Sequence, residues 1–141
     1  MNIVWLEDEP ETIDIIKYQL EDYLGKEIMV CQSFVSFSNE VEELEDKREN
    51  VIIIDIRMIF NREMHFYCFG KEIKVNNDLD SGFEYFNNCL KNRFEHIKII
   101  FFSSKPQSEA IKDAEKHAID TSLIVSKDYT TELLKIIKGI K

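Results

Sequence analysis

The sequence is poor in cysteine, proline and glycine, and it has no long apolar segment. Its 141 residues include three cysteines, two prolines and four glycines, and no two cysteines form a CxxC pair. The odd number and wide spacing argue against a disulfide framework or a zinc site, so we expect reduced, partly buried thiols. No apolar run could cross a bilayer, and no basic leader precedes the first one. We therefore expect a cytoplasmic protein with no membrane partner.

Basic residues are also scarce relative to acidic ones. The chain has 18 Lys and Arg against 27 Asp and Glu, a formal net charge of -9. This excess of negative charge argues against direct binding of nucleic acid, which requires basic surface to neutralise phosphates. The hydrophobic fraction of 44% and charged fraction of 32% are typical of a globular protein. The length is that of one domain, so we expect a single domain over residues 1–141.

Short apolar runs alternate with helical patterns along the whole chain. Two of the runs are nearly continuous Ile, Val and Phe, a pattern typical of strands covered on both faces. The alternation predicts an α/β fold with a five-stranded parallel sheet flanked by five helices. Ligands of such sheets bind at the carboxyl ends of the strands. The predicted strands are 3–6, 28–31, 51–54, 97–102 and 123–125, and the predicted helices are 11–24, 34–46, 81–94, 107–117 and 130–140.

One segment, about 59–79, interrupts this alternation after the third strand. Its roughly twenty residues are too many for an ordinary connection between a strand and a helix. Segments 65–69 and 72–75 flank Gly70-Lys71 and are consistent with a short β-hairpin, and residues 76–78 are typical of a turn. The insert is rich in aromatic residues for a free loop. Three alternatives stay open: exposed decoration, packing on its own domain, or packing on a partner. The aromatic residues are Phe60, Phe66, Tyr67 and Phe69.

Polar residues with complementary chemistry follow the predicted strands. Glu7 and Asp8 end the first strand, Asp55 the third, Ser103 the fourth, and Lys127 follows the fifth. Clustered carboxylates repel one another, and magnesium, which prefers oxygen ligands, would relieve that repulsion. Aspartate can accept a phosphoryl group covalently, and a lysine and a hydroxyl can hold the phosphoryl oxygens. The pattern predicts a magnesium site with Asp55 as phosphoacceptor.

Taken in order, these motifs resemble those of response-regulator receiver domains of the CheY-like family. The resemblance spans the chain apart from the insert, and it implies a flavodoxin-like sheet with strand order 2-1-3-4-5. The matching segments are the acidic motif 6–10, the phosphoacceptor strand with its following Met at 51–58, the Asp-Gly step at 80–84, the fourth strand with its terminal Ser at 99–104, and Lys127.

The resemblance implies a specific magnesium site. Asp8 and Asp55 would bind Mg²⁺ directly, together with the backbone carbonyl of Arg57. Glu7 would act through a metal-bound water.

It also implies the roles of the remaining site residues. Asp55 would accept a phosphoryl group from a sensor histidine kinase or a phosphotransfer protein. Ser103 and Lys127 would hold the phosphoryl oxygens. Output would pass through contacts with another protein, and homodimers through the last helices occur in the family. Apart from self-phosphorylation and autodephosphorylation assisted by Mg²⁺, the resemblance implies no enzyme activity.

The sequence departs from the family pattern at two positions. Asp128 follows the lysine where the family usually has Pro, and Ile124 occupies a position that is often aromatic and reports phosphorylation. An alternative is therefore a degenerate receiver that acts as an unphosphorylated docking module. Arg57 and Lys105 occupy positions that tune dephosphorylation in the family.

A magnesium-dependent hydrolase is a third hypothesis. Haloacid-dehalogenase-like phosphatases and Toprim-type nucleases need a second aspartate two residues after the first. Arg57 occupies that position after Asp55, which argues against both classes.

Overall fold

The structure is a computed structural model of the chain, and it describes residues 1–58, 64–76, 79–128 and 130–140. The predicted insert is therefore described in part. Residues 59–63, which include Phe60, and residues 77–78 of the predicted turn lie outside the described residues.

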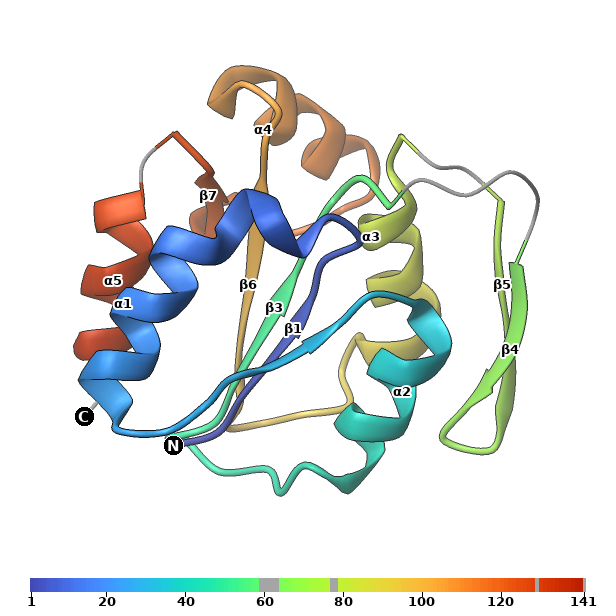
Figure 1. Cartoon of the computed structure of the whole chain (residues 1–141). Helices are drawn as coiled ribbons and strands as arrows, with labels where there is room; N and C mark the ends of the chain where they lie inside the picture. Colours follow the sequence, from blue (N-terminus) through green and yellow to red (C-terminus); the bar gives the residue numbers. More distant parts are fainter. Residues whose placement is uncertain (59–63, 77–78, 129, 141) are drawn as a thin grey trace.

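A five-stranded parallel sheet forms the centre of the molecule (Figure 1). Its strand order is β2-β1-β3-β6-β7, which confirms the predicted order 2-1-3-4-5 for the five strands of the sheet. All residues of β1 and β3 are buried, as expected for central strands covered on both faces. The strands are β1 Ile3–Leu6, β2 Met29–Cys31, β3 Val51–Ile54, β6 Lys98–Ser103 and β7 Ile124–Ser126.

The described residues form five α-helices, of which α5 follows the last strand, and local residues define several helix ends. Pro10 opens a 3-10 turn, η1 (Pro10–Ile13), so the first α-helix starts later than predicted. The Ser33 hydroxyl caps the second helix by accepting the Ser36 N–H. Gly25 ends the first helix with a left-handed φ of 69°. None of the described helices has the length and apolar character needed to cross a membrane. The helices are α1 Asp14–Leu24, α2 Phe34–Glu43, α3 Ser81–Tyr85, α4 Gln107–Lys116 and α5 Thr130–Lys138.

Other predicted boundaries also differ from the structure, for example at the third helix and the last strand. The third helix continues from α3 into a π-helical turn, η2 (Phe86–Leu90), and ends there instead of at Phe94. Leu123 belongs to the 3-10 turn η3 (Thr121–Leu123) instead of the last strand. The Asp120 side chain caps this turn by accepting the Ser122 N–H.

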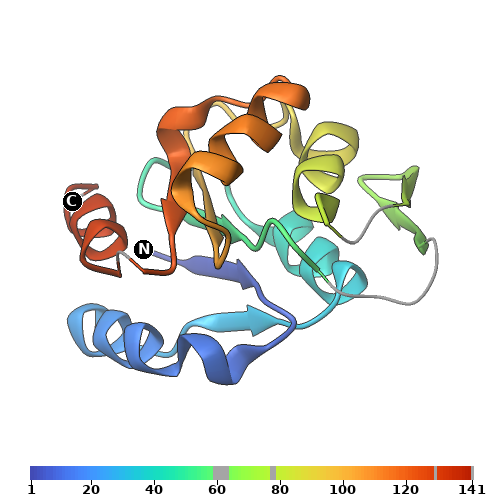
Figure 2. The same ribbon diagram turned by 90° about the horizontal axis from the view of Figure 1, so that it is seen from above.

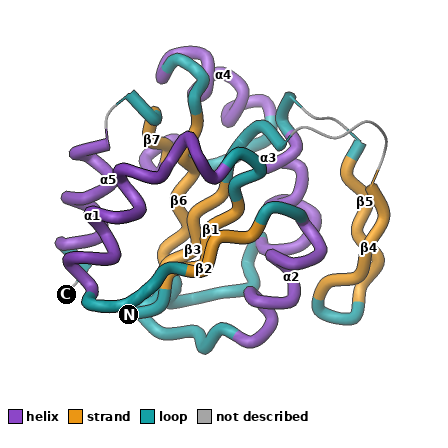
Figure 3. Tube along the Cα trace, in the orientation of Figure 1, coloured by secondary structure: helices purple, strands orange, loops and turns teal. Residues whose placement is uncertain are grey.

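The helices cover the two faces of the sheet unequally (Figures 2 and 3). One face packs against α1 and α5 through a core that includes Trp5 and Phe102. The other face packs against α2, α3 and α4 through a larger core that includes Leu6, Ile54 and Phe101. This division leaves the carboxyl ends of the strands between the two helix layers.

The described part of the insert forms an antiparallel hairpin of two strands, β4 (Met64–Cys68) and β5 (Lys71–Val75). The sequence predicts this hairpin with a turn at Gly70-Lys71, and the observed turn lies one residue earlier. Phe69 and Gly70 form the turn, with φ angles of 53° and 71°. Two consecutive left-handed residues suit the twist of a tight hairpin, and glycine adopts this conformation readily.

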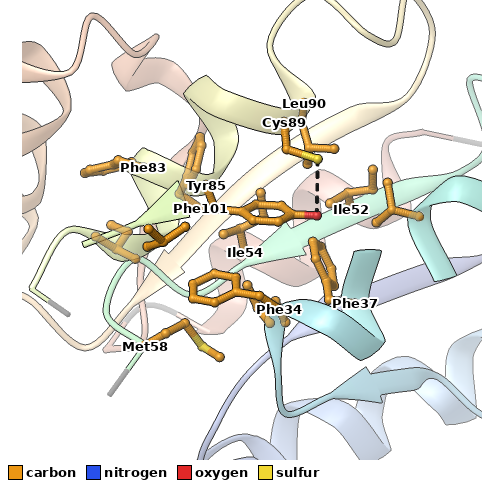
Figure 4. Packing of buried hydrophobic residues seen from close by; sticks show 14 of the residues in the cluster. Phe34, Phe37, Ile52, Ile54, Met58, Phe83, Tyr85, Cys89, Leu90 and Phe101 are labelled. Atoms are coloured by element: carbon orange, nitrogen blue, oxygen red, sulfur yellow. Dashed lines mark hydrogen bonds between the residues drawn. The ribbon is translucent and has the colours of Figure 1, made fainter. Parts of the chain in front are cut away.

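The hairpin packs on its own domain, outside α2 and α3 (Figure 1). Side chains alternate along both strands, so that one face is buried and the other faces solvent. The Phe66 ring lies 5.8 Å from Phe34 of α2 and 5.8 Å from Tyr85 of α3, and these two rings lie 5.2 Å from each other. Figure 4 shows Phe34 and Tyr85 within this core. The buried face consists of Phe66, Cys68, Ile73 and Val75.

The hairpin tip contacts two separate parts of the domain. The Phe69 N–H donates a 2.6 Å hydrogen bond to the Glu42 carboxylate on α2. The Arg93 guanidinium lies 4.1 Å from the centre of the Phe69 ring. These contacts stabilise an aromatic residue in a conformation that side chains rarely adopt.

Two of the three cysteines are paired, which corrects the expectation of reduced thiols. Cys68 of β4 forms a disulfide with Cys89 of η2, 21 residues further along the chain. Both sulfurs lie close to the Tyr85 hydroxyl, and Figure 4 shows its contact with Cys89. Cys31 is a buried free thiol, and burial, aided by the charge of Glu40, raises its pKa to about 11. Spacing alone could not reveal the pair, because folding of the insert brings it together.

Candidate functional site

Three carboxylates meet where β1 and β3 end. The register pairs Leu6 with Ile54, so Glu7 and Asp55 follow side by side at the same sheet edge. The Asp55 N–H donates a 3.0 Å hydrogen bond to the Leu6 carbonyl, which continues the strand pairing up to the site. Glu7, Asp8 and Asp55 each offer a carboxylate oxygen, and these atoms lie within 4.8 Å of one another. The structure therefore brings together the three predicted acidic residues.

Burial makes the negative charge of this group costly. The exposed fractions are 1% for Glu7 and 4% for Asp55. Burial, and after it the negative charge of Glu7, raise the pKa of Asp55 to about 9, although Lys127 opposes the shift. Two adjacent buried carboxyls cannot both ionise easily without a cation. The site therefore favours either a shared proton or a bound positive ion.

Lys127 supplies one positive charge, and it lies closer to Glu7 than to Asp55. Its Nζ is 2.5 Å from Glu7 Oε1 and 3.8 Å from Asp55 Oδ2. Its backbone N–H donates a 2.7 Å hydrogen bond to the Ser103 carbonyl, which fixes the chain after β7 beside the end of β6. The predicted lysine is thus in the site, and its main ionic partner is Glu7.

Ser103 lies at the same edge of the sheet. It is the last residue of β6, two positions beyond Phe101, which pairs with Ile54. The side chain is 1% exposed, and its Oγ accepts a 3.1 Å hydrogen bond from the Lys105 N–H. That bond uses the hydroxyl as an acceptor, and its proton is available to a further partner.

The segment after Asp55 is held by the start of α3. The Arg57 N–H donates a 3.2 Å hydrogen bond to Asp55 Oδ1, whereas the Arg57 side chain is exposed. The carbonyl before it, at Ile56, accepts the Gly82 N–H at 2.8 Å. The Ser81 hydroxyl accepts the Met58 N–H at 2.9 Å and donates to the Met58 carbonyl at 3.2 Å. These bonds close the insert at its base, close to Asp55.

The donor set fits magnesium. Carboxylate and carbonyl oxygens are the ligands that Mg²⁺ prefers, and it is usually bound through one or two carboxylates. Within the part of the chain that the structure describes, Glu7, Asp8 and Asp55 form the one group of acidic, His or Cys side chains close enough to share an ion. A cation there would offset the repulsion between Glu7 and Asp55.

A second charged cluster borders the site, and sequence reasoning missed it. Lys105 Nζ lies 2.9 Å from Asp80 Oδ1 and 2.5 Å from Asp113 Oδ2, and His117 Nε2 lies 3.3 Å from Asp80 Oδ2. Burial alone would raise the pKa of Asp80, but the bond to Lys105 and the contact with His117 outweigh it and lower the pKa. A hollow of about 380 Å³, also lined by Arg57, lies over this cluster.

The two departures from the family pattern have defined surroundings. Ile124 is 5% exposed, and its carbonyl accepts a 3.0 Å hydrogen bond from the Gln107 side chain at the start of α4. The Asp128 N–H donates a 3.2 Å hydrogen bond to the Ser126 hydroxyl, a bond that proline could not make.

No family model and no curated relative matches the sequence. Solved structures do match it. One is the receiver domain of a Francisella response regulator, with 16% identity, coverage of 99% of this chain and 94% of that one, and a TM-score of 0.57. Another is the N-terminal domain of an uncharacterized Wolinella succinogenes protein, with 16% identity, coverage of 99% and 95%, and a TM-score of 0.55. A third is a fusion carrying a trimeric coiled-coil segment of yeast Spc42, with 11% identity, coverage of 99% and 75%, and a TM-score of 0.62.

These matches define the class of fold. The chain has the receiver-domain fold of response regulators, as its motifs predicted. At such low identity the likeness establishes the fold, and the chemistry must be argued from the site.

Proposed function

We propose that the protein is a phosphoacceptor receiver domain of a two-component phosphorelay, phosphorylated on Asp55 in a reaction that requires Mg²⁺. The observation that carries the proposal is the buried group of Glu7, Asp8 and Asp55, with Lys127 Nζ 2.5 Å from Glu7 and 3.8 Å from Asp55. A buried nucleophilic carboxylate beside a cation site and a lysine suits phosphoryl transfer, which depends mainly on positioning and charge neutralisation. The phosphodonor is a phosphohistidine of a sensor kinase or a phosphotransfer protein.

In the transfer step an Asp55 carboxylate oxygen attacks phosphorus. The new O–P bond forms as the P–N bond to histidine breaks, and the imidazole nitrogen keeps the electron pair of that bond. Asp55 must be ionised to attack, so it must first lose the proton that burial and Glu7 favour. Bound Mg²⁺ supplies the charge neutralisation for this ionisation and for the incoming phosphoryl oxygens. Asp8, Asp55 and the Arg57 carbonyl would hold the ion, and Glu7 would act through a water.

Two further side chains bind the product. Lys127 pairs with Glu7 before the reaction and turns to the phosphoryl oxygens after it, a shift between neighbouring acceptors. Ser103 Oγ already accepts the Lys105 N–H, and its own proton is donated to a phosphoryl oxygen. These contacts draw the chain after β6 toward Asp55.

The protein is then a switch that signals by protein contact. Its only turnover is the gain and loss of its own phosphoryl group, so it acts on no external substrate. Its partners are a phosphodonor protein and an output protein, in the cytoplasm, and the last helix is a candidate surface for a homodimer.

The proposal can be tested by intact-mass measurement after incubation with acetyl phosphate and Mg²⁺. The parent should gain the mass of one phosphoryl group, and chelation of Mg²⁺ should prevent the gain. Asp55→Asn should gain nothing. The matched control is Asp14→Asn, an exposed aspartate of α1, which should behave like the parent.

A parent protein that gains no mass from acetyl phosphate or from a phosphohistidine donor, and that binds no beryllofluoride, would refute the proposal. That result would favour an unphosphorylated docking module. The aliphatic Ile124 in place of an aromatic reporter is the feature that would fit such a module.

A further inference from the structure

Lys105 lies at the centre of an ion-pair network that joins three parts of the fold. It belongs to the loop between β6 and α4, whereas Asp80 directly precedes α3 and Asp113 lies on α4. Its Nζ is 2.9 Å from Asp80 Oδ1 and 2.5 Å from Asp113 Oδ2. The side chains of Lys105, Asp80 and Asp113 are 11%, 18% and 13% exposed. The network is therefore largely shielded from water, unlike an ordinary surface salt bridge.

The same residue is tied to the phosphoryl-binding position by its backbone. The Lys105 N–H donates a 3.1 Å hydrogen bond to Ser103 Oγ, two residues earlier. A movement of Ser103 toward Asp55 would therefore displace Lys105. Its side chain cannot follow freely, because its Nζ is held by carboxylates from two other elements.

The carboxylates are themselves anchored. The second oxygen of Asp80 lies 3.3 Å from His117 Nε2 at the end of α4. The His117 carbonyl accepts a 2.8 Å hydrogen bond from Asn87 of η2. Ser81, next to Asp80, makes two hydrogen bonds to the backbone of Met58 near the phosphoacceptor. Lys105 therefore lies between α4, the base of the insert and the segment that follows Asp55.

We propose that Lys105 is a positioning residue that holds the Ser103 loop in its unphosphorylated place, and that release of its bonds to Asp80 and Asp113 transmits phosphorylation of Asp55 to α4 and to the base of the insert. The inference rests on the proposed phosphoacceptor function and adds its readout. The Lys105 side chain is either bound to both carboxylates or released from them, and these two arrangements are distinct. A two-state switch requires two such distinct arrangements. Such a switch would transmit phosphorylation without an aromatic side chain at position 124, where this chain has Ile124.

The test is the affinity for beryllofluoride in the presence of Mg²⁺, measured by isothermal titration calorimetry on the full chain. If the network stabilises the unphosphorylated arrangement, weakening it shifts the population toward the binding-competent arrangement. Lys105→Met and Asp113→Asn should each bind beryllofluoride about three- to tenfold more tightly than the parent.

Lys105→Met also separates this mechanism from a simple charge effect. Removal of a cation from the mouth of an anion-binding pocket should weaken binding by electrostatics alone. A tighter complex of Lys105→Met is therefore expected only if the network opposes switching. Lys105→Arg, which keeps both ion pairs, should restore an affinity close to that of the parent.

Lys116→Met is the matched control. Lys116 also pairs with Asp113, at 3.8 Å, but its side chain is 74% exposed. Its loss should leave the affinity within about twofold of the parent, because exposed pairs contribute little. The double variant of Lys105→Met with Asp113→Asn should gain less than the product of the two single effects, since both break the same contact.

The possible outcomes separate the two proposals. A parent that binds no beryllofluoride refutes the phosphoacceptor function itself. A parent that binds it, with folded Lys105→Met and Asp113→Asn variants of unchanged or weaker affinity, overturns the role of Lys105 and leaves the phosphoacceptor function intact. Thermal unfolding confirms that each variant is folded. Lys105→Gln, which also removes the cation and would weaken anion binding by charge alone, decides the matter if Lys105→Met does not fold.

Discussion

Gly82 packs its Cα directly against the backbone of Asp55. A Cβ at position 82 would overlap the Asp55 carbonyl oxygen and lie 2.8 Å from the Ile56 Cα. The Gly82 N–H donates a 2.8 Å hydrogen bond to the Ile56 carbonyl, so the approach is part of an ordered contact between α3 and the end of β3. This proximity requires a glycine at position 82, and it links the start of α3 to the position of Asp55.

The first prediction concerns this contact. Gly82→Ala should lower the free energy of unfolding by about 2–3 kcal/mol, because α3 must move away from Asp55 to admit the methyl group. It should also weaken Mg²⁺ binding several-fold, since Asp55 and the Arg57 carbonyl would shift. Urea unfolding and Mg²⁺ titration measure the two effects. Normal stability together with normal Mg²⁺ affinity would show that the contact is not as close as the structure has it.

The second prediction concerns pH. The folded protein raises the pKa of Asp55 to about 9 through burial and then through Glu7. Without Mg²⁺, the unfolded chain therefore releases this proton first, and stability should fall as pH rises from the ordinary aspartate range toward the raised value. Mg²⁺ must displace the same proton, so its affinity should increase with pH, by up to about tenfold per pH unit from about pH 6 to about pH 8.

Asp55→Asn is the control for this titration. It has no proton for the unfolded chain to release, so without Mg²⁺ the variant should be more stable than the parent, by about 1–2 kcal/mol near neutral pH. Its Mg²⁺ affinity should be low and independent of pH. A parent affinity that stays flat over the same range would contradict a shared proton between Asp55 and Glu7.

The third prediction concerns the insert. Phe66→Ala should destabilise the protein by about 3 kcal/mol, because it removes a ring that packs against both Phe34 and Tyr85. Tyr67→Ala, on the adjacent position of the same strand but 72% exposed, should change stability by less than about 0.5 kcal/mol. Urea unfolding of both variants gives the comparison. Equal effects would mean that the hairpin does not pack on the domain.

The fourth prediction concerns the thiols. Under denaturing but non-reducing conditions the chain should show one reactive thiol, from Cys31, because Cys68 and Cys89 are paired. After reduction the count should rise to three. Loss of the bridge by Cys68→Ser should lower the free energy of unfolding by about 3 kcal/mol, as expected for a loop of this length. Three reactive thiols before reduction would exclude the disulfide.

Much of the fold could be predicted from the sequence because its signals are local. Continuous Ile and Val in β3 reflect burial on both faces, and the resemblance to receiver domains implied the order of the strands. The proximity of Asp8 and Asp55 could be predicted for the same reason, since parallel strands place their carboxyl ends at one edge.

Most of the features that could not be predicted from the sequence depend on contacts between residues far apart in the chain. The bridge between Cys68 and Cys89 needs both the hairpin and the π-helical turn. The pairing of Lys105 with Asp80, 25 residues away, depends on how the loop after β6 lies against the start of α3. The hairpin turn at Phe69 was misplaced because an aromatic residue is an unusual choice for a left-handed position.

The geometry at the base of the insert has a consequence for how the hairpin could have been acquired in evolution. Ser81 and Gly82 meet Met58 and Ile56 by hydrogen bonds, so the chain leaves and re-enters the domain at nearly one point. The path of the five-stranded sheet is therefore indifferent to the length of chain between those residues. An ancestral domain with a short loop there could have acquired the hairpin as a single addition without any change in strand order. The hairpin adds a layer that covers apolar surface of α2 and α3. A shorter loop would leave this surface exposed to solvent or to contact with another protein.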